Sequence, residues 1–214
     1  QVEKKEPVLI PYMTIIYMIM ALFFAILLNF STDSDPFKVF LAGDEVMESN
    51  DGRGLNPLLQ HWAMIVHPPV LFLGYVSFAV PFAIAMASLI AGRVNLEWTR
   101  LVRRWTLFSW FTLGLGIMLG GKWAYEELGW GGYWAWDPVE NASLMPWLSG
   151  TAFIHSILVQ EKRGMLKVWN MVLVSISFLM CIYGTFLTKS GIVSSVHAFA
   201  NTDIGPYFAW YLLF

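Results

Sequence analysis

The sequence predicts an all-α protein, a polytopic integral membrane helical bundle, and three observations support this class. Hydrophobic residues make up 57% of the 214-residue chain, and the mean hydropathy is +0.58. Charged residues make up 13%, about half of their share in a water-soluble domain. Apolar runs of spanning length recur along the chain, and the charges collect between them. The expected environment is therefore a lipid membrane, and a net charge of −2 implies no nucleic-acid partner.

Five apolar runs have the roughly 17 to 25 residues that a helix needs to cross about 30 Å of hydrocarbon. Within one transmembrane region covering 1–214, we expect spans at about 8–30, 69–91, 105–121, 142–160 and 168–188, and a sixth from about 206 onwards. Gly116 and Gly120 have the GxxxG spacing that permits close helix contact. The single cysteine, Cys181, is expected to fill a small space in the core. Because the sequence starts at Gln1 and stops at Phe214 within an apolar run, we expect an excerpt of a longer polypeptide.

The distribution of charge predicts how the helices are oriented, because short cytoplasmic loops collect Lys and Arg. The connections after the second and fourth runs are basic and contain Arg93, Arg100, Arg103, Arg104, Lys162, Arg163 and Lys167. The connections after the first and third runs are acidic and contain Asp33, Asp35, Asp44, Glu45, Glu48, Asp51, Glu126, Glu127, Asp137 and Glu140. We therefore place the acidic connections on the extracytoplasmic side.

The third connection, which with its flanks covers residues 122–143, carries a high density of aromatic rings. They are Trp123, Tyr125, Trp130, Tyr133, Trp134 and Trp136. Glycines at 129, 131 and 132 let aromatic faces approach the backbone. The segment is too polar to cross a bilayer, so we expect it at the membrane surface, where amphipathic rings are favoured. It is either a platform for a ligand or a plain interfacial aromatic belt, and the density of rings favours the platform.

Two histidines are expected beside this platform. His67 stands before Pro68 and Pro69, a context that favours extended backbone and then the first turn of a helix, so we expect it at the outer mouth of the second span. His197 lies in the connection after the fifth run, which carries only Lys189 and Asp203 and is also placed outside. Two imidazoles beside indole faces fit axial ligation of a planar macrocycle such as haem. The alternative is a pair of solvated loop histidines.

His155 differs because it lies within the fourth apolar run, on the face shared by Trp147 and Thr151. An ionisable group inside a membrane is costly and is a candidate functional site by default. The alternative is a neutral imidazole that is hydrogen-bonded to a neighbouring helix. His61 precedes His67 in the same outer segment and is the rival ligand.

Asp137 and Glu140 form an acidic pair whose spacing has a structural explanation. In Asp-Pro-Val-Glu, Asp137 suits the N-cap, Pro138 the first helical position and Glu140 the third, which is a capping box. Pro146 allows a break, so we expect residues 138–145 to form a short surface helix before the fourth span turns inward.

The run Trp130-Gly-Gly-Tyr-Trp-Ala-Trp-Asp-Pro-Val-Glu-Asn-Ala-Ser143 resembles the tryptophan-rich WWD signature of haem-handling proteins in cytochrome c biogenesis. His67-Pro-Pro, Phe153-Ile-His-Ser and Ser195-Val-His-Ala-Phe are specifically similar to the CcmF-type haem lyase subunits of the bacterial pathway and their nitrite-reductase-associated relatives. The match covers most of the chain from about Gly54 onwards.

This resemblance implies a protein of the bacterial inner membrane that accepts haem on its periplasmic side and joins it to apocytochrome c. It implies that His67 and His197 ligate the haem substrate on the platform of Trp123, Trp130, Trp134 and Trp136. It also implies that His155 ligates a second, b-type haem, whose other ligand lies outside this excerpt and which reduces the platform haem. His61 matches no ligand of the family. Other cytochrome c maturation subunits, including a haem chaperone, are implied partners.

The chain has no Cys-x-x-Cys-His motif, so the acceptor of haem must be another protein that carries one. Attachment adds a thiolate to a haem vinyl group and needs positioning rather than a nucleophile in the enzyme, so no catalytic residue is assigned. Two other classes remain open: a haem conduit or chaperone that does not catalyse attachment, and a b-type cytochrome that only transfers electrons. His155 argues against the first, and the tryptophan platform argues against the second.

Overall fold

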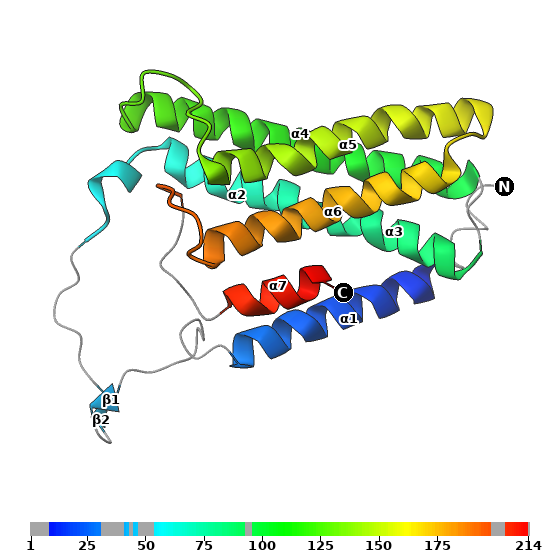
Figure 1. Ribbon diagram of the computed structural model, residues 1–214, viewed down its shortest axis with the longest axis horizontal. Coiled ribbons are helices and arrows are strands. Elements are labelled where there is room, and N and C mark those ends of the chain that lie inside the picture. Colours follow the sequence, from blue (N-terminus) through cyan, green and yellow to red (C-terminus); the bar gives the residue numbers. More distant parts are fainter. Residues whose placement is uncertain are drawn as a thin grey trace.

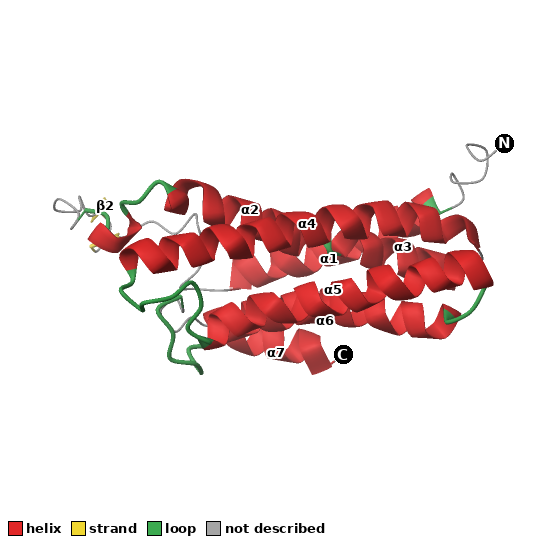
Figure 2. Cartoon of the chain, turned by 90° about the horizontal axis from the view of Figure 1, so that it is seen from above, coloured by secondary structure: helices red, strands yellow, loops and turns green. Residues whose placement is uncertain are grey.

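The structure is a computed structural model that describes residues 9–30, 41–42, 45–46, 54–92, 96–197 and 204–213. Long helices lie side by side with their axes along one direction (Figures 1 and 2). The helices are α1 (Ile10–Phe30), α2 (Ala63–Ser77), α3 (Ala79–Ile90), α4 (Leu96–Glu127), α5 (Pro138–Arg163), α6 (Lys167–Lys189) and α7 (Gly205–Leu213). A 3-10 turn covers Pro57–Leu59, and two-residue strands β1 (Leu41–Ala42) and β2 (Glu45–Val46) pair antiparallel. The predicted all-α class is confirmed.

The helices α3, α4, α5 and α6 enclose the main apolar core. Ile84, Val102, Phe153 and Ile157 are completely buried there, and Val174 is 1% exposed. In water, burial of such side chains is the main contribution to helix association. In lipid, close packing and interhelical hydrogen bonds are the main contributions. A buried hydrogen bond from Asn170 Nδ2 to Gln160 Oε1 (2.6 Å) joins α5 to α6.

Three helical segments among the described residues are long and apolar enough to cross a membrane: Ala63–Ile90, Pro138–Arg163 and Lys167–Lys189. The first of them combines α2 and α3, which meet at Phe78. The described apolar part of α1, Ile10–Ile26, is shorter. Helix α4 is 32 residues long and includes the whole of the expected span at 105–121. The multi-pass membrane character is therefore confirmed, while the exact span limits remain a prediction.

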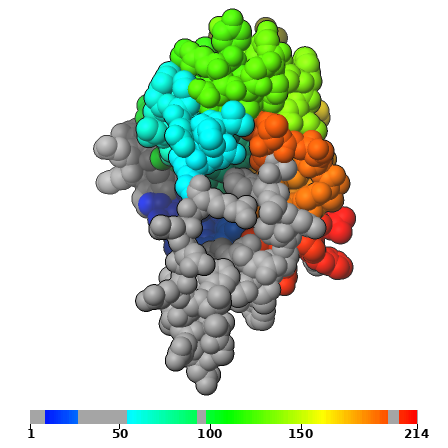
Figure 3. Space-filling model, turned by 90° about the vertical axis from the view of Figure 1, so that its left-hand side faces the viewer, coloured from blue at the N-terminus to red at the C-terminus, as the bar shows by residue number. Residues whose placement is uncertain are grey.

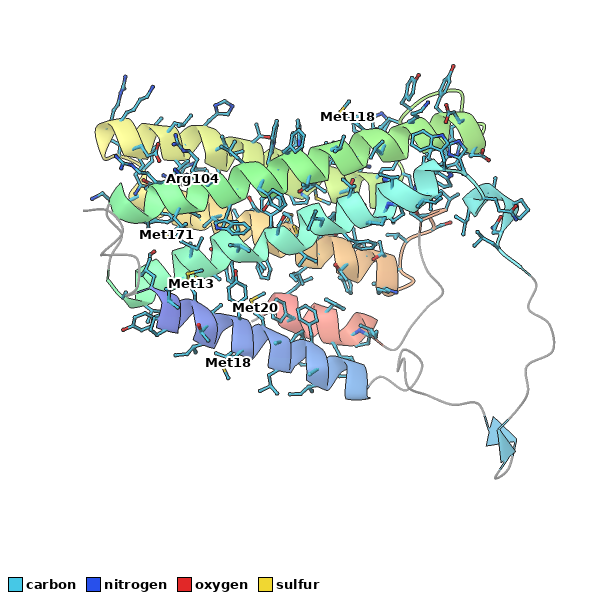
Figure 4. All side chains as sticks on the ribbon, turned by 180° about the vertical axis from the view of Figure 1, so that it is seen from behind. Met13, Met18, Met20, Arg104, Met118 and Met171 are labelled. Carbon is cyan, nitrogen blue, oxygen red and sulfur yellow. The ribbon has the colours of Figure 1, made fainter. Side chains whose placement is uncertain are left out.

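The two ends of the bundle differ in charge, as the orientation argument requires. The α3–α4 and α5–α6 connections lie at one end, and the aromatic α4–α5 connection lies at the other (Figure 1). Arg104 lies toward the first end of α4 and Met118 toward the second (Figure 4). At the first end, Arg103 donates to Glu161 Oε2 at 2.9 Å. Arg93 and most of the acidic residues expected between α1 and α2 lie outside the described residues.

Helices α2 and α4 pack closely because glycines remove side chains from their interface. A Cβ on Gly74 would lie 2.5 Å from the Leu113 backbone, and a Cβ on Gly116 would lie 2.6 Å from Leu71 Cα. The close contact expected from the GxxxG spacing is confirmed. Cys181 is buried beside Phe78 and Leu113, as expected for a residue that fills the core.

Two expectations about proline are wrong. Helix α2 begins at Ala63 and continues through Pro68 and Pro69, so His67 is inside the helix and does not precede it. Pro68 and Pro69 are the sixth and seventh residues of α2, so the carbonyls of Met64 and Ile65 lose their usual helical donors while the helix continues.

The break expected at Pro146 is also absent, because α5 is one helix from Pro138 to Arg163. Proline leaves the carbonyl four residues earlier without its helical donor. That carbonyl belongs to Ala142, and Tyr75 of α2 donates its hydroxyl hydrogen to it at 3.1 Å. The hydrogen bond that the helix loses is thus replaced from a neighbouring helix, and residues 138–145 are not a separate surface helix.

Candidate functional site

Three connections that are far apart in the sequence meet at the aromatic end of the bundle. Figure 3 looks onto this end and shows the segment before α2 (cyan), the α4–α5 connection (green) and the segment after α6 (orange) side by side. Between Leu128 and Asp137 the α4–α5 connection contains no helix. Gly129 and Gly131 have positive φ (66° and 73°), which explains why glycine occurs in these turns.

His67 is held by two glycines of α4. Its Nδ1 lies 2.7 Å from Gly116 O, and a carbonyl can only accept, so Nδ1 carries the proton. In a neutral imidazole, Nε2 is then the unprotonated nitrogen, the form that ligates a metal. A Cβ on Gly120 would lie 2.5 Å from His67 Cε1, so this glycine provides the space for the ring. The GxxxG pair therefore serves His67 as well as helix packing.

His197 is held by an acidic residue in the same way. Its Nδ1 lies 3.2 Å from Asp137 Oδ2, which already accepts the N–H groups of Val139 and Glu140 at 3.0 and 3.4 Å. Oδ2 is therefore an acceptor toward the imidazole, and in a neutral imidazole Nε2 is then the unprotonated nitrogen. The edges of Trp123 and Trp130 flank the ring, with centroids 5.9 and 6.1 Å from it.

Both histidines line one small cavity. It has a volume of about 50 Å³, and its other walls include Trp134, Glu140 and Ile117. The structure thus brings together two residues separated by 130 positions, and each presents a ring whose Nδ1 is already hydrogen-bonded. The cavity has room for one or two water molecules, given about 30 Å³ for each.

A much larger apolar groove lies directly beside this cavity. It measures about 850 Å³ and runs between α4 and α5. Trp134 and Ile117 line both spaces, so the side chain of Trp134 stands between them. The groove is also lined by Trp110 and Trp147, whose rings stack with centroids 5.2 Å apart. Sequence reasoning missed these two residues, because they lie within apolar runs that look like ordinary spans.

The four tryptophans of the expected platform have different surroundings. Trp123 is 4% exposed and donates Nε1–H to Leu58 O at 3.1 Å, so it forms the buried floor below His197. Trp130 packs in the same cluster. Trp134 meets Trp136 edge to face at 6.2 Å, and Trp136 is 72% exposed. Trp136 has a φ of 59°, which is uncommon for a residue other than glycine.

The predicted capping box at the start of α5 is confirmed. Asp137 accepts from the first turn, and Glu140 Oε2 accepts from the Asp137 N–H at 3.1 Å. Asp137 has a second set of contacts that the capping argument did not predict. Ser195 donates its hydroxyl hydrogen to Asp137 Oδ2 at 2.6 Å, beside His197. Ser195 lies 58 positions from Asp137 in the sequence, so the local spacing of residues could not predict this contact.

His61 makes contacts at both of its ring nitrogens. Nδ1 accepts from the Ala63 N–H at 3.3 Å, and Nε2 lies 3.2 Å from Glu126 Oε2. Glu126 is also bound by Lys122 at 2.5 Å. These contacts tie the start of α2 to the end of α4, and His61 does not line the cavity of His67 and His197.

His155 lies away from this end of the molecule. It is exposed on α5, about 22 Å along the helix axis from Glu140, given a rise of 1.5 Å per residue. Its neighbour at helical spacing, Thr151, accepts from Trp110 Nε1 at 2.7 Å. Among the described residues, His155 has no hydrogen bond or ion pair. The structure therefore does not place it in contact with His67 or His197.

Known proteins share this combination of segments. CycK of Bradyrhizobium diazoefficiens, a cytochrome c-type biogenesis protein, is 58% identical over 151 residues, which cover 71% of this chain and 23% of CycK. The cytochrome c-type biogenesis protein CcmF of Pseudomonas aeruginosa is 55% identical over 168 residues, covering 78% and 25%. NrfE of Haemophilus influenzae, also a cytochrome c-type biogenesis protein, is 47% identical over 175 residues, covering 81% and 27%.

A solved structure, Cytochrome c Heme Lyase CcmF, superimposes with a TM-score of 0.61 and 45% identity, covering 72% of this chain and 24% of that chain. The chain thus spans about a quarter of the length of these relatives. A family model described as Cytochrome C assembly protein matches residues 3–193. As the tryptophan-rich segment predicted, the chain belongs to the cytochrome c assembly protein family.

Proposed function

We propose that this chain is the haem-holding part of a haem lyase in the bacterial inner membrane, with its aromatic end facing the periplasm. It binds a haem substrate through His67 and His197 and presents it to an apocytochrome c that carries a CxxCH motif. One observation carries this proposal. Two imidazoles line the same cavity, and the Nδ1 atom of each is already hydrogen-bonded, to Gly116 O and to Asp137 Oδ2. Both rings thereby offer Nε2 to an iron atom.

The substrate fits this end only if the cavity opens, because about 50 Å³ cannot hold a porphyrin. Two residues, Trp134 and Ile117, line both the cavity and the 850 Å³ groove, and Trp134 has the larger side chain. Rotation of its side chain would join the two spaces and leave an apolar shelf of tryptophan rings beside both histidines. A pocket of several hundred Å³ with few polar groups is typical of small-molecule sites.

Attachment then requires positioning rather than a nucleophile from this chain. The thiol of the acceptor adds across a vinyl group: the S–H bond and the vinyl π bond break, one S–C bond and one C–H bond form, and nothing leaves. Holding the haem from both axial sides fixes the vinyl edges relative to the incoming thiols. Cys181 is buried within α6 and takes no part. Other maturation subunits, including a haem chaperone, are proposed as the source of haem.

We also propose that His155 is one ligand of a b-type haem. An exposed imidazole on a membrane-spanning helix, without a partner among the described residues, is costly unless something else binds it. Its donor atom therefore fits an iron whose other ligand comes from outside this chain. When bound, such a haem supplies an electron to the platform haem. The described residues contribute the imidazole and the apolar surface of α5 around it.

The platform is tested by coexpressing the full-length protein with a c-type apocytochrome and measuring covalent haem. We expect His67→Ala and His197→Ala each to lower attachment with normal levels of the protein in the membrane. His61→Ala is the matched control, since it removes a histidine from the same end that does not line the cavity. Normal attachment in the His67 and His197 double variant would exclude the ligand assignment. Haem retention without attachment in the wild-type protein would indicate a conduit.

The b-type haem is tested separately with His155→Gly. We expect its reduced-minus-oxidised spectrum to change or disappear, and covalent attachment to fall. Added imidazole should restore both, because it can occupy the space that the side chain leaves. A wild-type spectrum in this variant would mean that His155 is only a helix surface residue.

A further inference from the structure

One carboxylate oxygen joins three parts of the molecule that the proposed function needs. Asp137 Oδ2 accepts from the Ser195 hydroxyl at 2.6 Å, from Val139 N–H at 3.0 Å, from His197 Nδ1 at 3.2 Å and from Glu140 N–H at 3.4 Å. Two of these contacts belong to α5. The other two belong to the segment after α6, about 60 residues later.

Helix capping accounts for only half of this arrangement. An N-cap needs one side-chain oxygen for the N–H groups of the first turn, and Ser or Asn provides it about as well as Asp. The contacts to Ser195 and His197 add nothing to the start of α5. Ser195 also accepts the backbone N–H of His197 at 3.0 Å, so the turn that carries the imidazole is bound to Asp137 through two routes.

We propose that Asp137 is a positioning residue for the haem iron, acting through His197. This inference rests on the proposed function, in which His197 is an axial ligand. By accepting from Nδ1–H, Asp137 selects the neutral tautomer in which Nε2 is the unprotonated nitrogen, and it fixes the orientation of a ring that lines the cavity. A carboxylate partner also makes the imidazole a more basic ligand than a carbonyl partner does.

The two proposed ligands are therefore unequal. His67 donates to a neutral carbonyl, Gly116 O, whereas His197 donates to a carboxylate. The stronger electron donation from His197 stabilises ferric over ferrous iron, and second-layer hydrogen bonds of this kind are a known means of adjusting haem potential. Loss of the carboxylate charge should raise the reduction potential of the platform haem without removing either ligand.

Three substitutions separate this role from capping. Asp137→Ala removes the cap and the contact to His197. Asp137→Ser keeps a capping oxygen, but its side chain is too short to reach both α5 and His197. Asp137→Asn keeps the cap and a neutral acceptor. If Asp137 positions His197, haem retention should fall by about 10- to 100-fold in the Ser and Ala variants alike, and less in the Asn variant.

The full-length protein is measured for haem retention, for covalent attachment and, by potentiometric titration, for the potential of the platform haem. We expect the Asn variant to bind haem at a raised potential. If Ser and Asn variants behave like the wild type in all three measurements and only Ala is impaired, Asp137 is a cap alone. Thermal unfolding of the same proteins checks the cap, which predicts that only Ala loses stability.

His197→Ala distinguishes failure of this inference from failure of the proposed function. If His197→Ala abolishes haem retention while Asp137→Ser does not, His197 is a ligand that needs no positioning by Asp137. If His197→Ala retains and attaches haem normally, the ligand assignment itself is wrong, and the inference about Asp137 is overturned with it.

Discussion

A single hydroxyl group can replace the backbone hydrogen bond that a proline removes from a helix. Tyr75 is the clearest case, because its hydroxyl donates to the Ala142 carbonyl that Pro146 leaves without a helical donor. Space for this hydroxyl comes from Gly184 of α6, where a Cβ would lie 2.9 Å from the Tyr75 oxygen. Three helices, α2, α5 and α6, thus meet at one hydrogen bond.

Tyr75→Phe should lower the free energy of unfolding by about 1 kcal/mol, since it leaves a buried carbonyl without a donor. The matched test is a double-mutant cycle with Pro146→Ala, which returns the N–H to the helix. In the Pro146→Ala background, Tyr75→Phe should have almost no effect, because Ala142 O then has its own donor. Equal losses in both backgrounds, measured by denaturant unfolding in detergent, would show that the hydroxyl does not replace the helical bond.

Gly120→Ala tests whether the shape of the cradle sets the position of His67. The added methyl group would lie 2.5 Å from His67 Cε1, so the ring must move away from Gly116 O. We expect covalent haem attachment to fall at least 10-fold, by analogy with the loss of an orienting partner of a metal ligand. Gly132→Ala is the control, since its Cβ meets only Trp134 O at 3.9 Å. Wild-type attachment in Gly120→Ala would mean that the ring tolerates displacement.

Helices α2 and α4 pack with little space between them. Gly74 and Gly116 each let the opposite backbone approach to within contact distance. Gly74→Ala should therefore destabilise the protein by about 1–3 kcal/mol through overpacking. This loss exceeds the gain of about 1 kcal/mol that alanine gives a helix interior. Thermal unfolding in detergent measures the difference in stability between Gly74→Ala and the wild type. A higher melting temperature in the variant would contradict the close packing.

The sequence predicted those features whose physical cause is local. The spacing of Asp137 and Glu140 predicted the capping box, because all the atoms of a capping box lie within one helical turn. The apolar runs predicted the helices, because length and hydropathy are properties of a single segment. The resemblance to the family was carried by one contiguous tryptophan-rich motif and by three short segments, each of which can be read locally.

The features that the sequence did not predict depend on distant partners. Pro146 was expected to break α5, and only the fold brings Tyr75 within 3.1 Å of Ala142 O. His67 was expected outside its helix, since the local rule for residues before proline could not include the pocket that Gly116 and Gly120 provide. Ser195 and His197 reach Asp137 across about 60 positions.

At the scale of the whole molecule, the two ends of the bundle differ in composition. The basic connections and the Arg103–Glu161 ion pair lie at one end. The aromatic connection, the two orienting contacts and the cavity lie at the other. Met18 on α1 points away from the bundle, whereas Met20 points toward α7 (Figure 4). The outer side of α1 is therefore left free of contacts with the other described helices.

This arrangement predicts opposite accessibility at the two ends. Tyr133→Cys and Met165→Cys introduce thiols at positions that are 60% and 55% exposed, and Cys181 is buried enough to remain unlabelled. A maleimide that cannot cross membranes should label position 133 in cells with a permeabilised outer membrane. It should label position 165 only after lysis. Labelling of position 165 in intact cells would reverse the proposed orientation.

The hydrogen bond between His67 and Gly116 O makes the tautomer of one imidazole depend on how α2 packs against α4. Gly116 contacts Leu71 of α2 while its carbonyl holds His67, four residues earlier on the same helix. If α2 slid along α4 by even part of a turn, the ring would lose its acceptor, and Nδ1 would no longer be the nitrogen held in the protonated state. Bilayer thickness acts on helix tilt, and a change in tilt alters the contact between neighbouring helices. Under the proposed function, a change in bilayer thickness should therefore shift the visible spectrum of the platform haem.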